Sequence, residues 1–203
     1  MNIVWLDPWA PIDQPKAREA MQSELYCELS ASHPLFGLSA VAVARRYDQD
    51  DVLFELGDGR VAEVHLTWSR KPEPDPRWPR TTIFASAAVW AEERMRPLQL
   101  CSLIHFDAPL AKIEAGLAAL GWGSEPVATL TREHVADILQ RFASGEIDAA
   151  TVEAWANLVE GREDIQFEPG HEQVVLDAVH DLANPVLQGR LENIAPAVLA
   201  KLC

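Results

Sequence analysis

The stretch that decides the fold covers residues 40–68 and reads AVAVARRYDQDDVLFELGDGRVAEVHLTW. It contains three runs of high strand propensity, at 40–46, 52–56 and 60–68, and the turns between them read DQDD at 48–51 and GDG at 57–59. Connections this short join antiparallel neighbours, so the stretch predicts an antiparallel β-meander. In the third run, alternation places on one face Ala62, Val64, Leu66 and Trp68. The other face is more polar, which is typical of a sheet with one buried side.

Segments on both sides of the meander complete an N-terminal α+β unit. Apolar residues at three- and four-residue spacing predict a helix over 13–29, with Asp13 as its N-cap and Pro15 in its first turn. We expect this helix to cover the buried side of the sheet. Residues 69–80 hold four prolines, which predicts a loop. A strand over 81–85 and a helix from Ser86 to Arg96 follow, and we expect Pro97 to end that helix.

The pattern after Pro97 predicts helices only, at 109–120, 132–144, 149–160, 171–182 and 194–202, with Thr131, Asp148 and Asn193 as caps. The fold class is therefore α+β, an N-terminal antiparallel β-meander with flanking helices followed by a C-terminal all-α helical unit. Residues 1–97 hold 11 basic and 15 acidic side chains, net −4, whereas 98–203 hold 6 and 16, net −10. These differences predict an α+β domain at 1–97 and a helical domain at 108–203.

The charge of the chain restricts its partners. With 17 Lys and Arg against 31 Asp and Glu, the net charge of −14 disfavours nonspecific binding to nucleic acid or to an anionic membrane surface, so we expect a basic protein partner. The N-terminus does not read as a secretory signal, and no apolar run has the length of a membrane span, which predicts a cytoplasmic protein. The scattered Cys27, Cys101 and Cys203 predict reduced thiols.

Two segments resemble known groups of small, uncharacterised bacterial proteins. Residues 45–84 contain a V-H-L-T-W-S strand and a D-P-x-W-P loop, and residues 130–185 contain the progression G-E-I-x-A, W-A-N, E-G-R-E-D-I. Each segment is similar to one such family, so the chain resembles a fusion of two units. The resemblance assigns no catalytic residue. Immunity proteins of bacterial polymorphic toxins are frequently small, acidic and cytoplasmic, and the resemblance implies such a role.

Two places carry residues suited to binding a protein partner. Trp78 and Arg77 lie in the proline-rich loop, and Trp and Arg dominate interface hot spots. In the alternative interpretation Trp78 folds this loop back onto the sheet and Trp68 belongs to the core. The second place is an acidic turn formed by Glu160, Glu163 and Asp164, which would steer a cationic surface. In the alternative interpretation the turn is solvated, and Arg162 neutralises its neighbours.

Evidence for catalysis or ligand binding is weak. His65 and Trp68 mark the place where a hydrolase or transferase site would lie, but the strand offers His65 only Glu63 as an orienting carboxylate. Residues 48–51 lack the distal Glu of a calcium loop, His171 and His180 lack zinc-ligand spacing, and the GDG turn lacks a phosphate-binding context. We therefore expect no metal, no cofactor and no enzymatic activity.

The leading hypothesis is a cytoplasmic immunity protein that binds and neutralises a toxin domain with a basic contact face. The alternatives are a small hydrolase or transferase with a site near His65 and Trp68, and a scaffold subunit of a larger complex.

Overall fold

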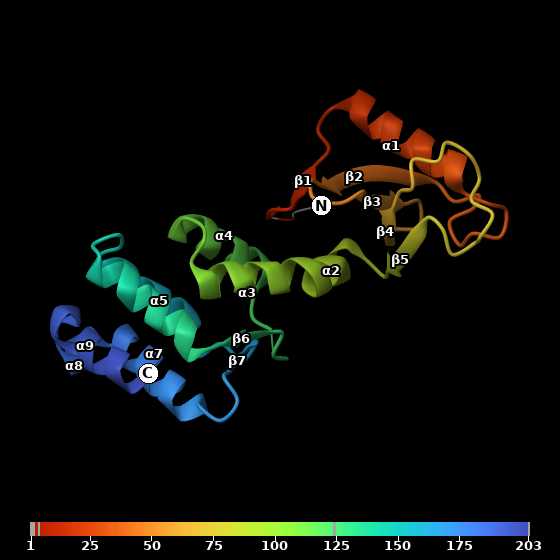
Figure 1. Ribbon diagram of the computed structural model, residues 1–203. Helices are drawn as coiled ribbons and strands as arrows, with labels where there is room; N and C mark the ends of the chain where they lie inside the picture. Colours follow the sequence, from red (N-terminus) through yellow and green to blue (C-terminus); the bar gives the residue numbers. More distant parts are fainter. Residues whose placement is uncertain (1–2, 4, 124, 203) are drawn as a thin grey trace. The chain divides into compact units, whose positions relative to one another are not determined.

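The computed structural model describes residues 3, 5–123 and 125–202 (Figure 1). The chain forms two compact units, Met1–Met95 and Arg96–Cys203, called unit 1 and unit 2 below. In the part of the chain that the structure describes, no helix has the length and apolar character required to cross a bilayer. Cys27 and Cys101 are exposed free thiols, and Cys203 lies outside the described residues.

Unit 1 is built on a five-stranded antiparallel sheet whose strands are adjacent in chain order. Its strands are β1 (Trp9–Pro11), β2 (Ala40–Arg46), β3 (Asp51–Leu56), β4 (Val61–His65) and β5 (Arg80–Phe84). The predicted meander and the α+β class are confirmed. The third predicted run extended to Trp68, whereas β4 ends at His65.

Helix α1 (Pro15–Glu28) covers one face of this sheet, as predicted (Figure 1). Its Met21 and Leu25 pack with Phe54 and Val64 in a common core. The predicted cap is wrong, because the N-cap residue is Gln14 rather than Asp13, and its side chain makes no capping bond. A proline at the helix start needs no N–H partner there, so the chain begins this helix without a side-chain cap.

The other face of the sheet is covered in part by α2 (Ala87–Trp90), which Ser86 caps as predicted by accepting from the Val89 N–H. The fully buried Trp90 packs edge-on against Trp9, with ring centroids 5.0 Å apart. Its Nε1 donates to Oε2 of Glu63 at 2.8 Å. Glu63 is therefore bound to Trp90 rather than to His65.

The prediction that Pro97 ends a helix is wrong. A π-helical turn, η1 (Ala91–Met95), follows α2, and α3 (Arg96–His105) follows directly with Pro97 as its second residue. The missing N–H of a proline costs little at this place, because the π-helical turn already interrupts the regular i→i−4 ladder. Residues 98–105, which the sequence analysis placed between two domains, are therefore helical.

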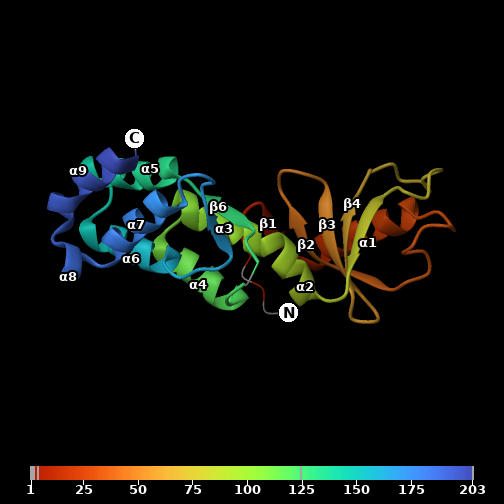
Figure 2. The ribbon, with the colours of Figure 1, turned by 90° about the horizontal axis from the view of Figure 1, so that it is seen from below.

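Unit 2 consists mainly of helices (Figure 2): α4 (Leu110–Leu120), α5 (Arg132–Ala143), α6 (Ala149–Val159), α7 (Glu172–Ala183), α8 (Pro185–Gln188) and α9 (Leu191–Leu202). They surround a core that contains the fully buried Trp155. Thr131 and Asp148 cap α5 and α6 as predicted, whereas Asn193 lies inside α9. Unit 2 also holds two three-residue parallel strands that the sequence did not predict, β6 (Ala128–Leu130) and β7 (Ile165–Phe167).

Close contact between α3 and α4 gives a test of the packing in unit 2. A Cβ atom added at Gly116 of α4 would overlap the carboxamide of Gln99, which is fully buried and donates from Nε2 to the Ile113 carbonyl at 2.9 Å. We expect Gly116→Ala to lower the free energy of unfolding by about 1–3 kcal/mol, measured by urea denaturation, because the side chain has no free space to enter. At Gly57 an added Cβ would make only an ordinary 3.4 Å contact with Ser39. Equal destabilisation by Gly57→Ala would contradict this account.

Candidate functional site

Pairing of the strands places a row of charged residues at one end of the sheet. The register sets Asp51 of β3 opposite His65 of β4, and His65 opposite Arg80 of β5. Directly paired residues share one face of a sheet, so these three side chains are neighbours. Arg46 of β2 joins them, because its Nη1 lies 3.8 Å from Oδ2 of Asp51. The row lies on the face opposite α1, where the sequence analysis expected polar residues.

The Asp51–His65 pair is the closest ion-pair contact of this row. Nδ1 of His65 lies 2.8 Å from Oδ1 of Asp51, a carboxylate that is nearly buried. An ionised carboxylate only accepts, so Nδ1 donates, and the neutral ring keeps its lone pair at Nε2. No described residue forms a hydrogen bond with Nε2. Asp51 is thus the orienting carboxylate that the sequence analysis missed, and the register of neighbouring strands was the signal that could have revealed it.

The two tryptophans near this row are both exposed. Trp78 is 40% exposed, and its ring lies edge-on to His65 with the centroids 6.2 Å apart. It both returns the loop to the sheet and remains accessible. Trp68 is 42% exposed and donates from Nε1 to Oδ1 of Asp50 at 2.8 Å. The prediction that Trp68 lies on the buried face is wrong, because β4 ends before it and its φ of 56° turns the chain outward.

Arg77 lies beside Trp78 and is paired within the loop. Its Nη2 donates to Oδ2 of Asp75 at 2.6 Å, and its Nε donates to the same carboxylate. Hydrogen bonds from the Arg77 side chain, and then from its backbone N–H, lower the pKa of Asp75 to about 2. The Arg77 side chain is strongly exposed, so the pair holds the guanidinium in place at the surface.

Carboxylates of α1 hold the loop that carries both tryptophans. Both carboxylate oxygens of Glu28 lie 3.0 Å from the Thr67 N–H, and Oε1 of Glu24 accepts from the Arg70 N–H at 2.9 Å. Burial raises the pKa of the Glu28 carboxyl, although the Thr67 N–H opposes this shift. The loop is therefore anchored to α1 on each side of Trp68.

His33 anchors the far end of the same loop. It is buried, accepts the Leu35 N–H at Nδ1 (3.1 Å) and therefore donates from Nε2 to the Pro79 carbonyl (3.0 Å). We expect His33→Leu to lower the free energy of unfolding of unit 1 by about 1–2 kcal/mol, because both bonds are lost. Urea denaturation followed by tryptophan fluorescence measures this change.

The stability difference between the native chain and His33→Leu should depend on pH. This dependence distinguishes the loss of the His33 hydrogen bonds from a simple loss of packing. Burial lowers the pKa of His33 from its ordinary 6.5, although the Pro79 carbonyl opposes the shift. As the pH falls below 6.5, the unfolded chain binds a proton at His33 more readily than the folded chain does. The stability that His33 contributes is therefore complete above pH 6.5 and is lost as the pH falls below it. The advantage of the native chain over His33→Leu should shrink on going from neutral to acidic buffer. A difference that stays constant with pH would contradict the assignment.

The acidic turn of unit 2 does not behave as one surface. Asp164 is fully buried and accepts from Nε and Nη2 of Arg162 at 2.8 and 2.7 Å, and from Nη1 of Arg96 at 2.8 Å. Its assignment as a contact residue is therefore corrected, because an internal ion pair uses it. The alternative interpretation, in which Arg162 neutralises its neighbours, holds for Asp164. Glu163 is exposed, and the half-buried Glu160 accepts from Nδ1 of His180 at 2.8 Å.

Trp122 is an exposed residue that the sequence analysis missed. It is 70% exposed, and the guanidinium carbon of Arg162 lies 4.9 Å from its ring centroid. It stands between Gly121 and Gly123 after the end of α4. The sequence Gly-Trp-Gly at 121–123 was the signal that could have indicated an exposed tryptophan, because a loop offers no regular helix or strand to bury the side chain.

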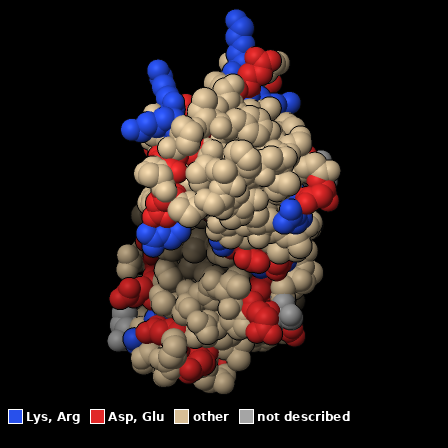
Figure 3. Space-filling view, turned by 90° about the vertical axis from the view of Figure 1, so that its right-hand side faces the viewer, with Lys and Arg blue, Asp and Glu red and all other residues tan. Residues whose placement is uncertain are grey.

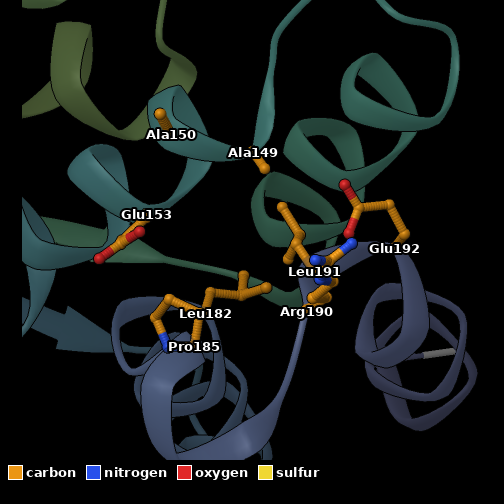
Figure 4. Close-up of a pocket in the computed structure, with 8 residues that line it drawn as sticks. All are labelled: Ala149, Ala150, Glu153, Leu182, Pro185, Arg190, Leu191 and Glu192. Atoms are coloured by element: carbon orange, nitrogen blue, oxygen red, sulfur yellow. The ribbon is translucent and has the colours of Figure 1, made fainter.

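A hollow of about 320 Å³ lies elsewhere in unit 2, between the starts of α6 and α9 (Figure 4). Arg190 and Glu192 lie on one side of it, and Glu153 lies on the α6 side. It contains none of the predicted site residues. Its charged lining residues are one arginine and two glutamates.

Comparison of the chain with protein-family models, with curated proteins and with solved structures finds no match in any of the three. The resemblance to two bacterial families therefore stays a prediction.

Proposed function

We propose that this chain is an immunity protein that acts in the cytoplasm and neutralises a bacterial toxin domain by stoichiometric binding. The observation that supports this most is a group of exposed aromatic residues at one end of the sheet of unit 1. Tyr47 (62% exposed) lies in the β2–β3 turn, Trp68 follows β4, and Trp78 precedes β5. These three residues and Arg77 are called the sheet-end surface below.

The sheet-end surface has the composition and the order of a protein contact. Trp, Tyr and Arg are the residues most enriched at interfaces and their hot spots. Their side chains are held before binding: Trp68 by Asp50, Trp78 by His65 and Arg77 by Asp75. Side chains that are already ordered lose less entropy on association, which favours tight binding.

Charge supports a basic partner. The net charge of −10 in residues 98–203 favours the approach of a cationic surface and raises the association rate at low salt. Near physiological ionic strength the Debye length is only about 8 Å, so this advantage is partly lost. Figure 3 shows one face of the molecule, on which both acidic and basic side chains lie around a broad area without charged residues. Charge would therefore guide the approach, whereas aromatic contacts supply affinity.

The first test is whether a toxin is encoded beside this gene, and the second is co-expression of the chain with that toxin. A genome with no toxin gene next to this one would count against the proposal. We expect the chain to restore growth of cells that carry the active toxin, and the two proteins to elute as one stable complex in size-exclusion chromatography. A neighbouring toxin that is neither bound nor neutralised would overturn the proposal.

The Asp51–His65 pair favours a second candidate, a hydrolase or transferase in which Nε2 of His65 accepts a proton from a nucleophile. An oriented imidazole is the group that such chemistry requires. Asp51→Asn separates the two candidates, because it removes the orienting carboxylate while the His65 ring that contacts Trp78 remains. Under the binding proposal the variant still forms the complex and protects cells, whereas under the enzymatic candidate it loses all protection while it still binds.

A further inference from the structure

Trp122 forms one wall of a hollow of about 390 Å³ on unit 2. Leu117 and Ala118 of α4 line it, together with Leu158 of α6. Ligand pockets range over about 300–1,000 Å³, so a volume at the low end of this range suits a side chain rather than a cofactor. The walls are apolar enough to accept the aliphatic part of such a side chain.

Arg162 supports the indole of Trp122 from inside the protein. This guanidinium is almost buried and makes two hydrogen bonds with Asp164, so its position is determined by the ion pair. The guanidinium lies over one face of the indole, while Trp122 as a residue is 70% exposed. The π-electrons of an exposed indole attract a second cation.

The charges at the hollow also favour a cation. Its two charged lining residues are Arg162, which is almost buried and shares the Asp164 carboxylate with Arg96, and Glu114. Glu114 is exposed, and no described residue forms an ion pair with it. The side-chain carbonyl of Asn157 adds a neutral acceptor at the same hollow. Because Arg162 is almost buried and Glu114 is exposed, the charge that the hollow presents to solvent is that of Glu114.

We infer that this hollow receives an arginine or lysine side chain of a protein partner, whose stem packs on Leu117 and Leu158 and whose charged end lies between Trp122 and Glu114. The inference deepens the proposed function, since it assigns a contact for the basic face of the toxin. It requires no particular placement of unit 1 relative to unit 2.

A small probe tests the hollow without the toxin. Nα-acetyl-arginine amide is titrated at constant ionic strength into the full chain, and the indole N–H signals are followed by NMR, with the Trp122 signal identified by its loss in Trp122→Phe. We expect a saturable shift of the Trp122 signal. Glu114→Gln should weaken binding about two- to fivefold, and the uncharged analogue Nα-acetyl-citrulline amide should produce no saturable shift. Glu133→Gln on α5 is the matched control and should bind the probe as the native chain does.

The outcomes separate the inference from the proposed function. No shift of the Trp122 signal, or an equal shift with the citrulline analogue, overturns the inference even if a toxin complex forms. Probe binding that depends on Glu114 supports the inference even if no toxin is neutralised. Where the complex is available, Trp122→Phe and Glu114→Gln should each weaken it, and a complex of unchanged affinity in both variants would overturn the assignment to the toxin contact.

Discussion

Replacing Asp164 with asparagine is expected to lower the free energy of unfolding of unit 2 by about 3–5 kcal/mol. Asp164 is fully buried, and its carboxylate accepts hydrogen bonds from both Arg162 and Arg96. Breaking a buried ion pair by removing one partner leaves the other charge out of water without compensation, which costs more than the pair itself contributes. Urea denaturation followed by circular dichroism measures the change.

Glu163→Gln is the matched control, because it removes an adjacent carboxylate that is exposed. It should change stability by less than about 0.5 kcal/mol. Similar values for the two variants would show that net charge, rather than the buried pair, stabilises this turn. The comparison also separates the two halves of the predicted acidic patch: Glu163 can contact a partner, whereas Asp164 stabilises the unit.

Strong acid should reproduce in the native chain part of the stability loss that Asp164→Asn causes. Burial alone would raise the pKa of Asp164, but hydrogen bonds from Arg162 and its charge, followed by the bond from Arg96, outweigh burial and hold the pKa below its ordinary 3.8. A depressed carboxyl pKa contributes stability above the unfolded value of 3.8, and this stability is lost as the pH falls below it. The difference between the native chain and Asp164→Asn should therefore be constant at neutral pH and shrink in strong acid.

Replacing Trp78 with alanine is expected to weaken the toxin complex by about 2 kcal/mol or more, roughly thirtyfold in the dissociation constant. Trp78 is the exposed aromatic residue of the sheet-end surface that contacts His65, and it offers a large, ordered apolar area. Titration calorimetry with the purified toxin domain measures the loss. Arg77→Ala removes an exposed charge and should cost less, at about 1 kcal/mol or below.

Phe36→Ala serves as the control for Trp78, because Phe36 is also an exposed aromatic residue but lies in the connection between α1 and β2. It should leave the affinity unchanged. Every variant is compared only after its unfolding curve shows a folded protein. If Trp78→Ala binds as tightly as the native chain, the sheet-end surface is not the contact.

The candidate site was predictable only where residues are close in the chain. Trp78 and Arg77 stand next to each other in a proline-rich loop, and the structure shows both exposed. Asp51 lies 14 residues from His65, and only the pairing of β3 with β4 brings them together. Arg96 and Asp164 are 68 residues apart, so the sequence could not show that Asp164 of the acidic turn forms a buried ion pair.

The sequence by itself determined the meander, the helix that covers it and most helices of unit 2, because hydrophobic periodicity and turn residues act over a few positions. The tertiary structure alone decided which polar residues meet. In the tertiary structure Trp68 lies outside the core because β4 ends before it, and Pro97 lies within α3 after a π-helical turn. Strands β6 and β7 pair with each other. Each of these outcomes depends on contacts between distant segments, whose free energies outweigh local preference once the chain is packed.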